Sequence, residues 1–244
     1  MKIALIGDVH ANLPALEAII EHAHQREVEA FWNVGDWVGY FAHPDEVVRR
    51  IRREEAISIV GNYDLKVLKA PKKGEKWRES KHPLKWLAFG WAFENLSEES
   101  RAFLRSLPKE VRLEMCGWRV LLTHGSPASN EEPLTPQTPE ARLHELIRMA
   151  RADVIVCGHS HQPFTRQVEG VWFVNAGSVG RPDDGDPRAS YAVLTLDVGE
   201  LQVAHYRVKY DLERAVRAVR QAGLPEAFAR MLLQGRALDA IESG

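Results

Sequence analysis

Short apolar runs, separated by helical patterns, dominate the first 160 residues, and each run ends at a polar cluster. The runs consist mostly of β-branched or aliphatic residues, which is typical of buried strands. They cover residues 3–6, 30–34, 56–60, 120–122 and 154–156. Because ligands bind beyond the carboxyl ends of strands in layered α/β folds, we expect the five clusters to lie together. The clusters are Gly7-Asp8-Val9-His10, Gly35-Asp36, Gly61-Asn62-Tyr63-Asp64, Thr123-His124-Gly125 and Gly158-His159-Ser160-His161.

The rest of the pattern predicts helices between these strands and a second sheet after them. Apolar residues that recur every three or four positions indicate helices over 13–26, 44–53 and about 139–151. Four later runs are typical of consecutive antiparallel strands, and we expect them to form the second sheet. They cover 164–168, 171–174, 189–196 and 201–208. Two further helices are expected over 211–223 and 224–234.

The segment 66–107 interrupts this alternation. A basic stretch that contains Pro and Gly leads into a stretch rich in Trp and Phe, directly after the Asn62 cluster. One interpretation is a lid that stacks a base or aryl group on Trp77, Trp86 or Trp91 while lysines contact phosphates. The other is a helical hairpin that buries its aromatic residues, or a contact between two copies of the chain.

Composition favours a one-domain enzyme and excludes several other classes. The chain has 244 residues, 45% apolar content and a formal charge of −2, so it has no overall attraction to long nucleic acids or anionic membranes. Cys116 and Cys157 are not spaced for zinc and are expected to be free thiols. No run approaches the roughly 20 apolar residues of a membrane span. The first predicted strand and the first polar cluster already occupy residues 3–10, where a signal peptide would lie. We therefore expect a cytoplasmic protein, and a homo-oligomer stays open.

The chemistry of the five clusters points to divalent metal ions. They offer carboxylate, amide and imidazole donors and no thiolate, which suits Mn, Fe, Co, Ni or Zn held for hydrolysis. Two such ions about 3.5 to 4 Å apart can hold a phosphoryl group and lower the pKa of a shared water. Seen alone, any one cluster is more often a turn or a helix cap. All five in order indicate a metal site.

The order of the clusters and the residues in them resemble the motifs of the calcineurin-like metallophosphoesterase family, in its bacterial intracellular phosphodiesterase-type branch. The resemblance covers roughly the first 190 residues and includes the blocks Gly35–Tyr40 and Asn175–Gly180. It implies an α/β fold, a four-layer sandwich of two mixed β-sheets flanked by helices. We expect that domain over 1–210, with a helical, Trp-rich insertion at about 66–107. A C-terminal helical extension over 211–244 is expected to pack on the same domain.

The same resemblance implies which residues hold two metal ions, with Mn the first expectation and Fe, Zn, Ni or Co as alternatives. Asp36 would be the carboxylate that bridges the two ions. One ion would be held by Asp8, His10, Asp36 and His161, and the other by Asp36, Asn62, His124 and His159.

One departure from the family bears on the reaction. The family commonly has a His after the Gly-Asn pair, where this chain has Tyr63, and its protein phosphatases have an Asp where this chain has Gly39. Both parts of an acid pair are therefore missing. A positioned general acid is worth about 10²- to 10⁴-fold, and alkyl phosphomonoesters depend on it most. The departure favours phosphodiesters or phosphoanhydrides.

The sequence thus predicts a two-metal phosphodiesterase that hydrolyses a small nucleotide-like or aryl diester by attack of a metal-bridging hydroxide. Dinucleoside polyphosphate hydrolysis and phosphomonoester hydrolysis stay open, as does a metal-binding scaffold without catalysis. The predicted catalytic residues are Asp36, Asn62, Tyr63 and His124. The predicted substrate contacts are Asn62, Tyr63, Arg181 and Arg188.

Overall fold

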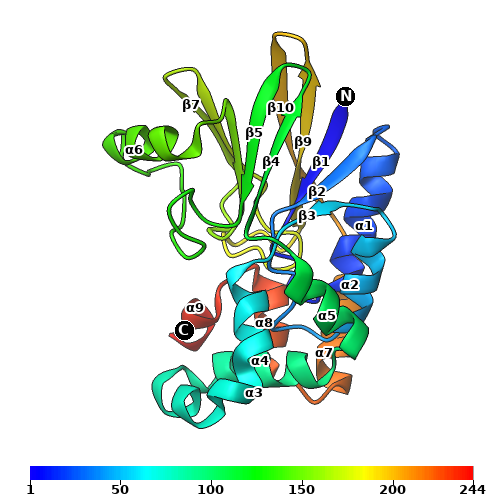
Figure 1. The fold of residues 1–244 in the computed structure, drawn as a ribbon. Coiled ribbons are helices and arrows are strands. Elements are labelled where there is room, and N and C mark those ends of the chain that lie inside the picture. Colours follow the sequence, from blue (N-terminus) through cyan, green and yellow to red (C-terminus); the bar gives the residue numbers. More distant parts are fainter. Residues whose placement is uncertain (244) are drawn as a thin grey trace.

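The computed structural model describes residues 1–243, apart from the side chains at positions 74 and 75. Its first sheet has the order β10-β9-β1-β2-β3 (Figure 1). Strands β1, β2 and β3 are parallel, with Ile3 opposite Ala30, while β9 runs antiparallel to both β1 and β10. The strands are β1 (Lys2–Ile6), β2 (Ala30–Asn33), β3 (Ile57–Ser58), β9 (Ala189–Asp197) and β10 (Glu200–Val208).

The second sheet is formed by one continuous stretch of the chain, from residue 110 to residue 175. Its order is β4-β5-β6-β8-β7, with β5, β6 and β8 parallel and the two outer strands antiparallel to their neighbours. The strands are β4 (Glu110–Met115), β5 (Trp118–Thr123), β6 (Val154–Cys157), β7 (Phe164–Val168) and β8 (Val171–Asn175).

The predicted grouping of the four strands after His161 into one sheet is wrong. Strands β7 and β8 join the second sheet, whereas β9 and β10 join the first. The reason is visible in β9, which is buried on both faces over most of its length and lies between β1 and β10. A strand that is apolar on both faces suits the inside of a sheet, and its position between two partners satisfies that pattern.

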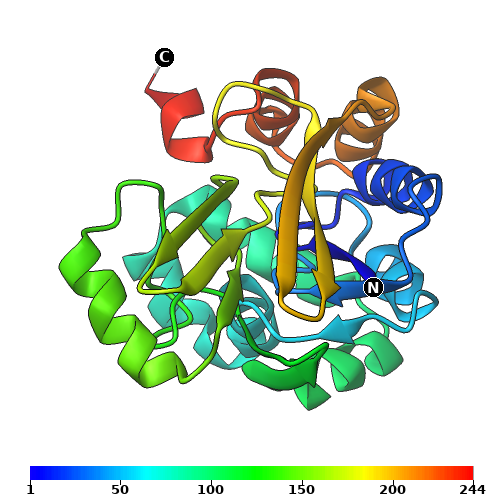
Figure 2. The same cartoon turned by 90° about the horizontal axis from the view of Figure 1, so that it is seen from above.

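Helices cover the outer face of each sheet. Figure 2 shows α6 (Glu140–Ala150) outside the second sheet, and α1 (Leu13–His24) and α7 (Leu212–Gln221) outside the first. One apolar core lies between the sheets and includes Trp32, Leu122 and Val156. Separate cores join each sheet to its helices. The predicted four-layer sandwich of two mixed sheets is confirmed.

Six more helices lie within residues 1–243. Helices α3, α4, α8 and α9 lie beyond the end of the sheets at which β1 finishes (Figure 1). Trp77 and Phe89 meet edge to face at 6.0 Å between ring centroids, so aromatic side chains pack α3 against α4. No helix within residues 1–243 is long and apolar enough to cross a membrane. These helices are α2 (Pro44–Arg52), α3 (Asn62–Ser80), α4 (Pro83–Glu94), α5 (Glu98–Ser106), α8 (Glu226–Gln234) and α9 (Leu238–Glu242).

Candidate metal centre

All five polar clusters meet where the two sheets come together. The first sheet and the helix after it contribute four of the seven predicted ligands, and the second sheet contributes three. Asp8 and His10 follow β1, Asp36 follows β2 and Asn62 begins α3; His124 follows β5, and His159 and His161 follow β6. Six of the seven are buried, and His159 is half-buried.

Two groups of potential ligands share the carboxylate of Asp8. Asp8, His10 and His161 form one group, and Asp8, Asp36 and His124 form the other, with the ligand atoms of each within 4.8 Å of one another. Asp36 lies between two histidines, because Oδ2 is 3.8 Å from Nε2 of His10 and Oδ1 is 3.4 Å from Nε2 of His124. Each oxygen of the Asp36 carboxylate therefore has a histidine nitrogen within 4 Å.

Hydrogen bonds orient the histidine rings toward the cluster. Nδ1 of His124 donates to the carbonyl oxygen of Val34 at 2.8 Å, and Nδ1 of His161 donates to that of Arg181 at 2.7 Å. Each bond directs Nε2 into the cluster, where Nε2 of His124 also lies 3.1 Å from Oδ1 of Asn62. Partners of this kind fix the tautomer of metal-binding histidines.

The cluster contains acceptor atoms that face each other, which fits a bound cation. Nδ1 of His161 donates to the backbone carbonyl oxygen of Arg181, so Nε2 of a neutral His161 ring carries a lone pair. This Nε2 lies 3.2 Å from the carboxylate oxygen Oδ1 of Asp8. That oxygen is buried and accepts no hydrogen bond. Nε2 of His10 lies 3.3 Å from the same nitrogen of His161. Oxygen and imidazole donors without a thiolate suit a divalent ion.

Burial and neighbouring charged groups shift the pKa values of the side chains in the cluster. Burial alone would raise the pKa of the Asp36 carboxyl, but the His124 and His10 rings and the backbone N–H of Tyr63 lower it below its ordinary value. Burial would likewise lower the pKa of His124, yet the Asp36 carboxylate raises it to about 9. Burial and the Arg181 guanidinium hold the pKa of His10 well below its ordinary value, so its ring is neutral.

The backbone of the cluster is strained. Asp8, His10, Asp36, His159 and His161 all have left-handed backbone conformations, with φ between 49° and 65°. Such a conformation costs an L-residue about 1 to 2 kcal/mol. It persists where the surrounding structure imposes it, and such outliers concentrate at functional sites. The left-handed residues His159 and His161 lie in the short loop between β6 and β7.

Close packing of the loops requires glycine at two positions in particular. A Cβ atom on Gly61 would lie 2.1 Å from both the backbone nitrogen and Oδ1 of Asp36. A Cβ atom on Gly158 would lie 2.5 Å from Oδ2 of Asp8. Any side chain here would displace a predicted ligand.

Asp64 is a residue that the sequence placed in a cluster without giving it a role. Its buried carboxylate accepts four backbone N–H groups, those of Gly61, Asp36, Trp37 and Val38, at 2.8 to 3.1 Å. It therefore holds the loop of the predicted bridging ligand against the start of α3. The available signal was its position three residues after Gly61, where a capping carboxylate is common.

The predicted substrate contacts lie in two different environments. The guanidinium of Arg181 lies 3.3 Å from Nδ1 and 3.4 Å from Nε2 of His161, beside the cluster. Arg188 is instead bound to the carboxylate of Asp186 through Nε and Nη2, at 3.0 and 2.6 Å. Burial raises the pKa of Tyr63 well above its ordinary value.

The loop that follows His124 forms a rim beside the cluster. The carbonyl oxygen of Glu131 lies 3.2 Å from Nε2 of His159, which leaves Nδ1 of that ring for a ligand bond. The carboxylate of Glu131 binds Nζ of Lys66 at 2.9 Å, so the rim is joined to α3. A cavity of 460 Å³ lies along this loop and is lined by residues 126–131.

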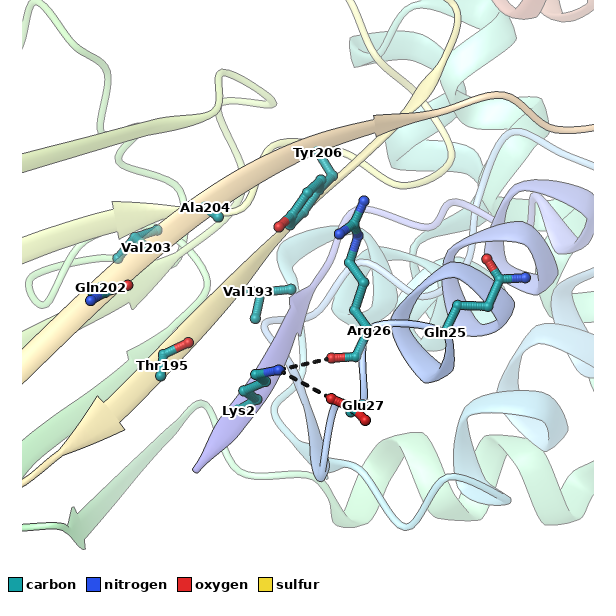
Figure 3. Close-up of a pocket in the computed structure, with 10 residues that line it drawn as sticks. All are labelled: Lys2, Gln25, Arg26, Glu27, Val193, Thr195, Gln202, Val203, Ala204 and Tyr206. Atoms are coloured by element: carbon teal, nitrogen blue, oxygen red, sulfur yellow. Dashed lines mark hydrogen bonds and ion pairs between the residues drawn. The ribbon is translucent and has the colours of Figure 1, made fainter.

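Another cavity, of 350 Å³, lies away from the candidate ligands. It is lined by the start of β1, the residues that follow α1, and strands β9 and β10. Figure 3 shows Arg26 and Tyr206 side by side in it. None of the predicted metal ligands lines this cavity.

Fold and cluster together define a candidate metallohydrolase, since two mixed sheets present buried carboxylates and imidazoles at their common edge. The chain belongs to the calcineurin-like phosphoesterase superfamily, whose domain model matches residues 1–199. Membership in a phosphoesterase family identifies it as a hydrolase, and the family implies divalent metal ions.

Three relatives illustrate the relationship. The uncharacterized protein MJ0912 of Methanocaldococcus jannaschii is 32% identical over 96% of this chain and 98% of its own length. The crystal structure of a metallophosphoesterase from Sphaerobacter thermophilus is 31% identical, with a TM-score of 0.79, and the alignment covers 96% of this chain and all of that one. Phosphodiesterase YfcE of Escherichia coli is 25% identical over 81% of this chain and 89% of its own length.

Proposed function

We propose that this protein is a phosphodiesterase that uses two divalent metal ions to hydrolyse a small nucleotide-like or aryl phosphodiester. The observation that carries the proposal is the position of Asp36, whose two carboxylate oxygens face His10 on one side and His124 on the other. An anionic ligand between two ions screens their repulsion, and this arrangement supports two ions over one. The phosphodiesterase name of the Escherichia coli relative adds support.

The proposed ligand sets are those that the family resemblance implies. Asp8, His10, Asp36 and His161 would hold one ion, and Asp36, Asn62, His124 and His159 the other. Bound ions would lower the pKa of a water molecule and neutralise charge on the phosphoryl group. The protein contributes a buried setting, and there Asp36, Asn62 and His124 keep their positions through bonds to the backbone or to each other.

The substrate preference rests on what is missing from the cluster. Neither Tyr63 nor Gly39 replaces the family's acid pair with a comparable proton donor. We therefore favour diesters and anhydrides, whose leaving groups need protonation less. Tyr63 and Arg181 are proposed to bind the phosphoryl oxygens, together with Asn62. Arg188 is proposed as an outer contact, which requires the substrate to compete with Asp186.

The test is hydrolysis of bis(p-nitrophenyl) phosphate beside p-nitrophenyl phosphate, by protein stripped of metal and reloaded with Mn. We expect turnover of the diester to exceed that of the monoester, to require metal, and to fall at least about a hundredfold in Asp36→Asn. Metal content of both proteins is measured by elemental analysis. Protein that binds two ions per chain yet hydrolyses neither ester would contradict the proposal and favour a scaffold role. Faster turnover of the monoester would favour a phosphomonoesterase.

A further inference from the structure

Two tyrosine hydroxyls meet beside the candidate metal centre. The hydroxyl oxygens of Tyr40 and Tyr63 are 2.6 Å apart, and their rings stack with centroids 5.2 Å apart and an angle of 28°. Two hydroxyls carry two protons, and the bond between them uses one. No other hydrogen bond of either hydroxyl is found within the described part of the chain. The pair therefore has one proton to donate to a further acceptor.

The surroundings of the pair are those of an anion site. The guanidinium carbon of Arg181 lies 4.8 Å from the Tyr40 ring centroid and 6.0 Å from that of Tyr63. Both rings meet His10 edge to face, at 5.6 and 5.1 Å between centroids. A positive charge and a predicted metal ligand therefore both contact the pair. An anion bound to the metal ions on this side would have both a cation and a hydroxyl proton within reach.

Packing holds the pair in this position. The ring of Phe228, from α8, meets Tyr40 edge to face at 5.4 Å, and the ring of Phe89, from α4, meets Tyr63 in the same way at 5.1 Å. The backbone of Tyr40 is left-handed, with φ of 67°, which is unusual for an aromatic residue. The backbone N–H of Gly185 also donates to the carbonyl oxygen of Gly235 at 2.8 Å, which ties the loop after Arg181 to the end of α8.

We propose that Tyr40 is a positioning residue that donates its hydroxyl proton to Tyr63, so that Tyr63 donates its own to a phosphoryl oxygen of the substrate beside Arg181. The inference rests on the proposed function and adds a residue to it. No proton is transferred in this arrangement, because both tyrosines act as hydrogen-bond donors. A donor that itself accepts a hydrogen bond is a stronger donor, which gives Tyr40 its effect.

The experiment uses the Mn-loaded protein and two readouts, binding of inorganic phosphate by calorimetry and KM against kcat for bis(p-nitrophenyl) phosphate. Tyr63→Phe is expected to weaken phosphate binding about tenfold or more, the usual effect of losing a hydrogen bond to a charged group. Tyr40→Phe is expected to weaken it about three- to tenfold. Both variants are expected to raise KM more than they lower kcat, with metal content unchanged.

The double variant separates positioning from packing. If Tyr40 acts through Tyr63, Tyr40→Phe has no further effect on phosphate binding when Tyr63 is already Phe. Additive losses in the double variant would overturn the assignment of Tyr40. The matched control is Tyr191→Phe, because Tyr191 also stacks on a tyrosine, Tyr206, at 5.4 Å and 29°. The control is expected to bind phosphate like the unaltered protein.

The outcomes distinguish this inference from the proposed function. Diester hydrolysis by the unaltered protein, combined with unchanged phosphate binding in Tyr63→Phe, would leave the phosphodiesterase proposal standing and overturn the role of the tyrosine pair. Absence of hydrolysis in the unaltered protein would contradict the phosphodiesterase proposal. Calorimetry would then still test the tyrosine pair as a phosphate site.

Discussion

Two stacked tyrosine pairs in this molecule have nearly the same parts and different surroundings. Tyr40 and Tyr63 stack beside the candidate metal centre, and Tyr191 and Tyr206 stack on the outer side of the first sheet. Each pair has an arginine over a ring, Arg181 at 4.8 Å from Tyr40 and Arg26 at 4.2 Å from Tyr206. Each also has a histidine against the edges of both rings, His10 and His22.

The pairs differ in the hydrogen-bond partners of their hydroxyl groups. In the outer pair, the Tyr191 hydroxyl bonds to Nδ1 of His22 at 2.8 Å, and that histidine is on a helix that packs on the sheet. In the inner pair the hydroxyls bond to each other, and the histidine belongs to the metal cluster. A tyrosine, an arginine and a histidine in contact are therefore not a site by themselves. The inner pair differs because it lies beside a candidate metal ligand, His10.

Metal ions should produce the largest difference between the two regions. A ligand at about a thousand times its Kd stabilises the folded state by about 4 kcal/mol per site. We expect thermal unfolding of the stripped protein to move to higher temperature on addition of Mn. The same shift is expected in Tyr191→Phe, and a much smaller one in Asp36→Asn. Equal midpoints with and without saturating Mn would contradict a metal site in the cluster.

Displacing the inner pair should have the next largest effect. Gly39 has φ of 101°, and a Cβ atom there would lie 2.9 Å from Cδ1 of Tyr63. Gly39→Ala is expected to lower the free energy of unfolding by about 2 kcal/mol, from backbone strain and this clash, and to reduce diester turnover. Urea denaturation and kcat/KM measure the two effects.

The control for this variant is Gly199→Ala, in the turn between β9 and β10. Gly199 has φ of 74°, but nothing lies within 4 Å of its added Cβ atom. It isolates the backbone strain, and we expect full activity. If both variants kept the same turnover, Gly39 would not be needed to seat the Tyr63 ring.

Removing the hydroxyl of the outer pair should affect stability alone. Tyr191 is fully buried, and Tyr191→Phe leaves Nδ1 of His22 without this partner. The expected loss is about 1 kcal/mol of unfolding free energy, the usual value for one hydrogen bond. We expect kcat/KM for the diester to stay unchanged. Reduced turnover in this variant would show that the two pairs are coupled through the sheet.

The smallest effect concerns the charge beside the outer pair. Partial burial and the Arg26 guanidinium lower the pKa of His22, so the unfolded chain binds a proton more readily at this residue. Its contribution to stability is therefore present above the unfolded pKa of about 6.5 and lost as the pH falls. Arg26→Gln should raise the pKa of His22 toward that value, as followed by NMR titration. An unchanged pKa would assign the shift to burial alone.

The sequence was sufficient to place all five clusters, because each depends on a local pattern of an apolar run, a glycine and a donor side chain. It did not predict which sheet would receive β9, since alternation of side chains does not identify the neighbouring strand. Strand β4 was missed because its residues alternate between exposed and half-buried, without the apolar run that marks the inner strands.

The roles of Asp64 and Tyr40 could not be predicted for a different reason. Asp64 acts by accepting N–H groups from residues 36 to 38, and Tyr40 by meeting a hydroxyl 23 positions away. Such long-range contacts have no signature at Tyr40, and at Asp64 the position three residues after Gly61 indicates a helix cap but not the contacts with residues 36 to 38. The expected ligands, in contrast, were recognised from the order of five local clusters along the chain and from the family resemblance.

The second sheet is one continuous segment set between two halves of the first, and this arrangement fixes an order of events during synthesis. Strands β4 to β8 are complete once residue 175 has emerged, whereas β1 must wait for β9, which begins at residue 189. Domains fold as the chain emerges from its N-terminal end. Four of the seven candidate ligands thus lie on the first sheet or on the helix after it, and this sheet is completed last. Acquisition of metal ions should therefore be a late step in the maturation of the chain, after both sheets have met.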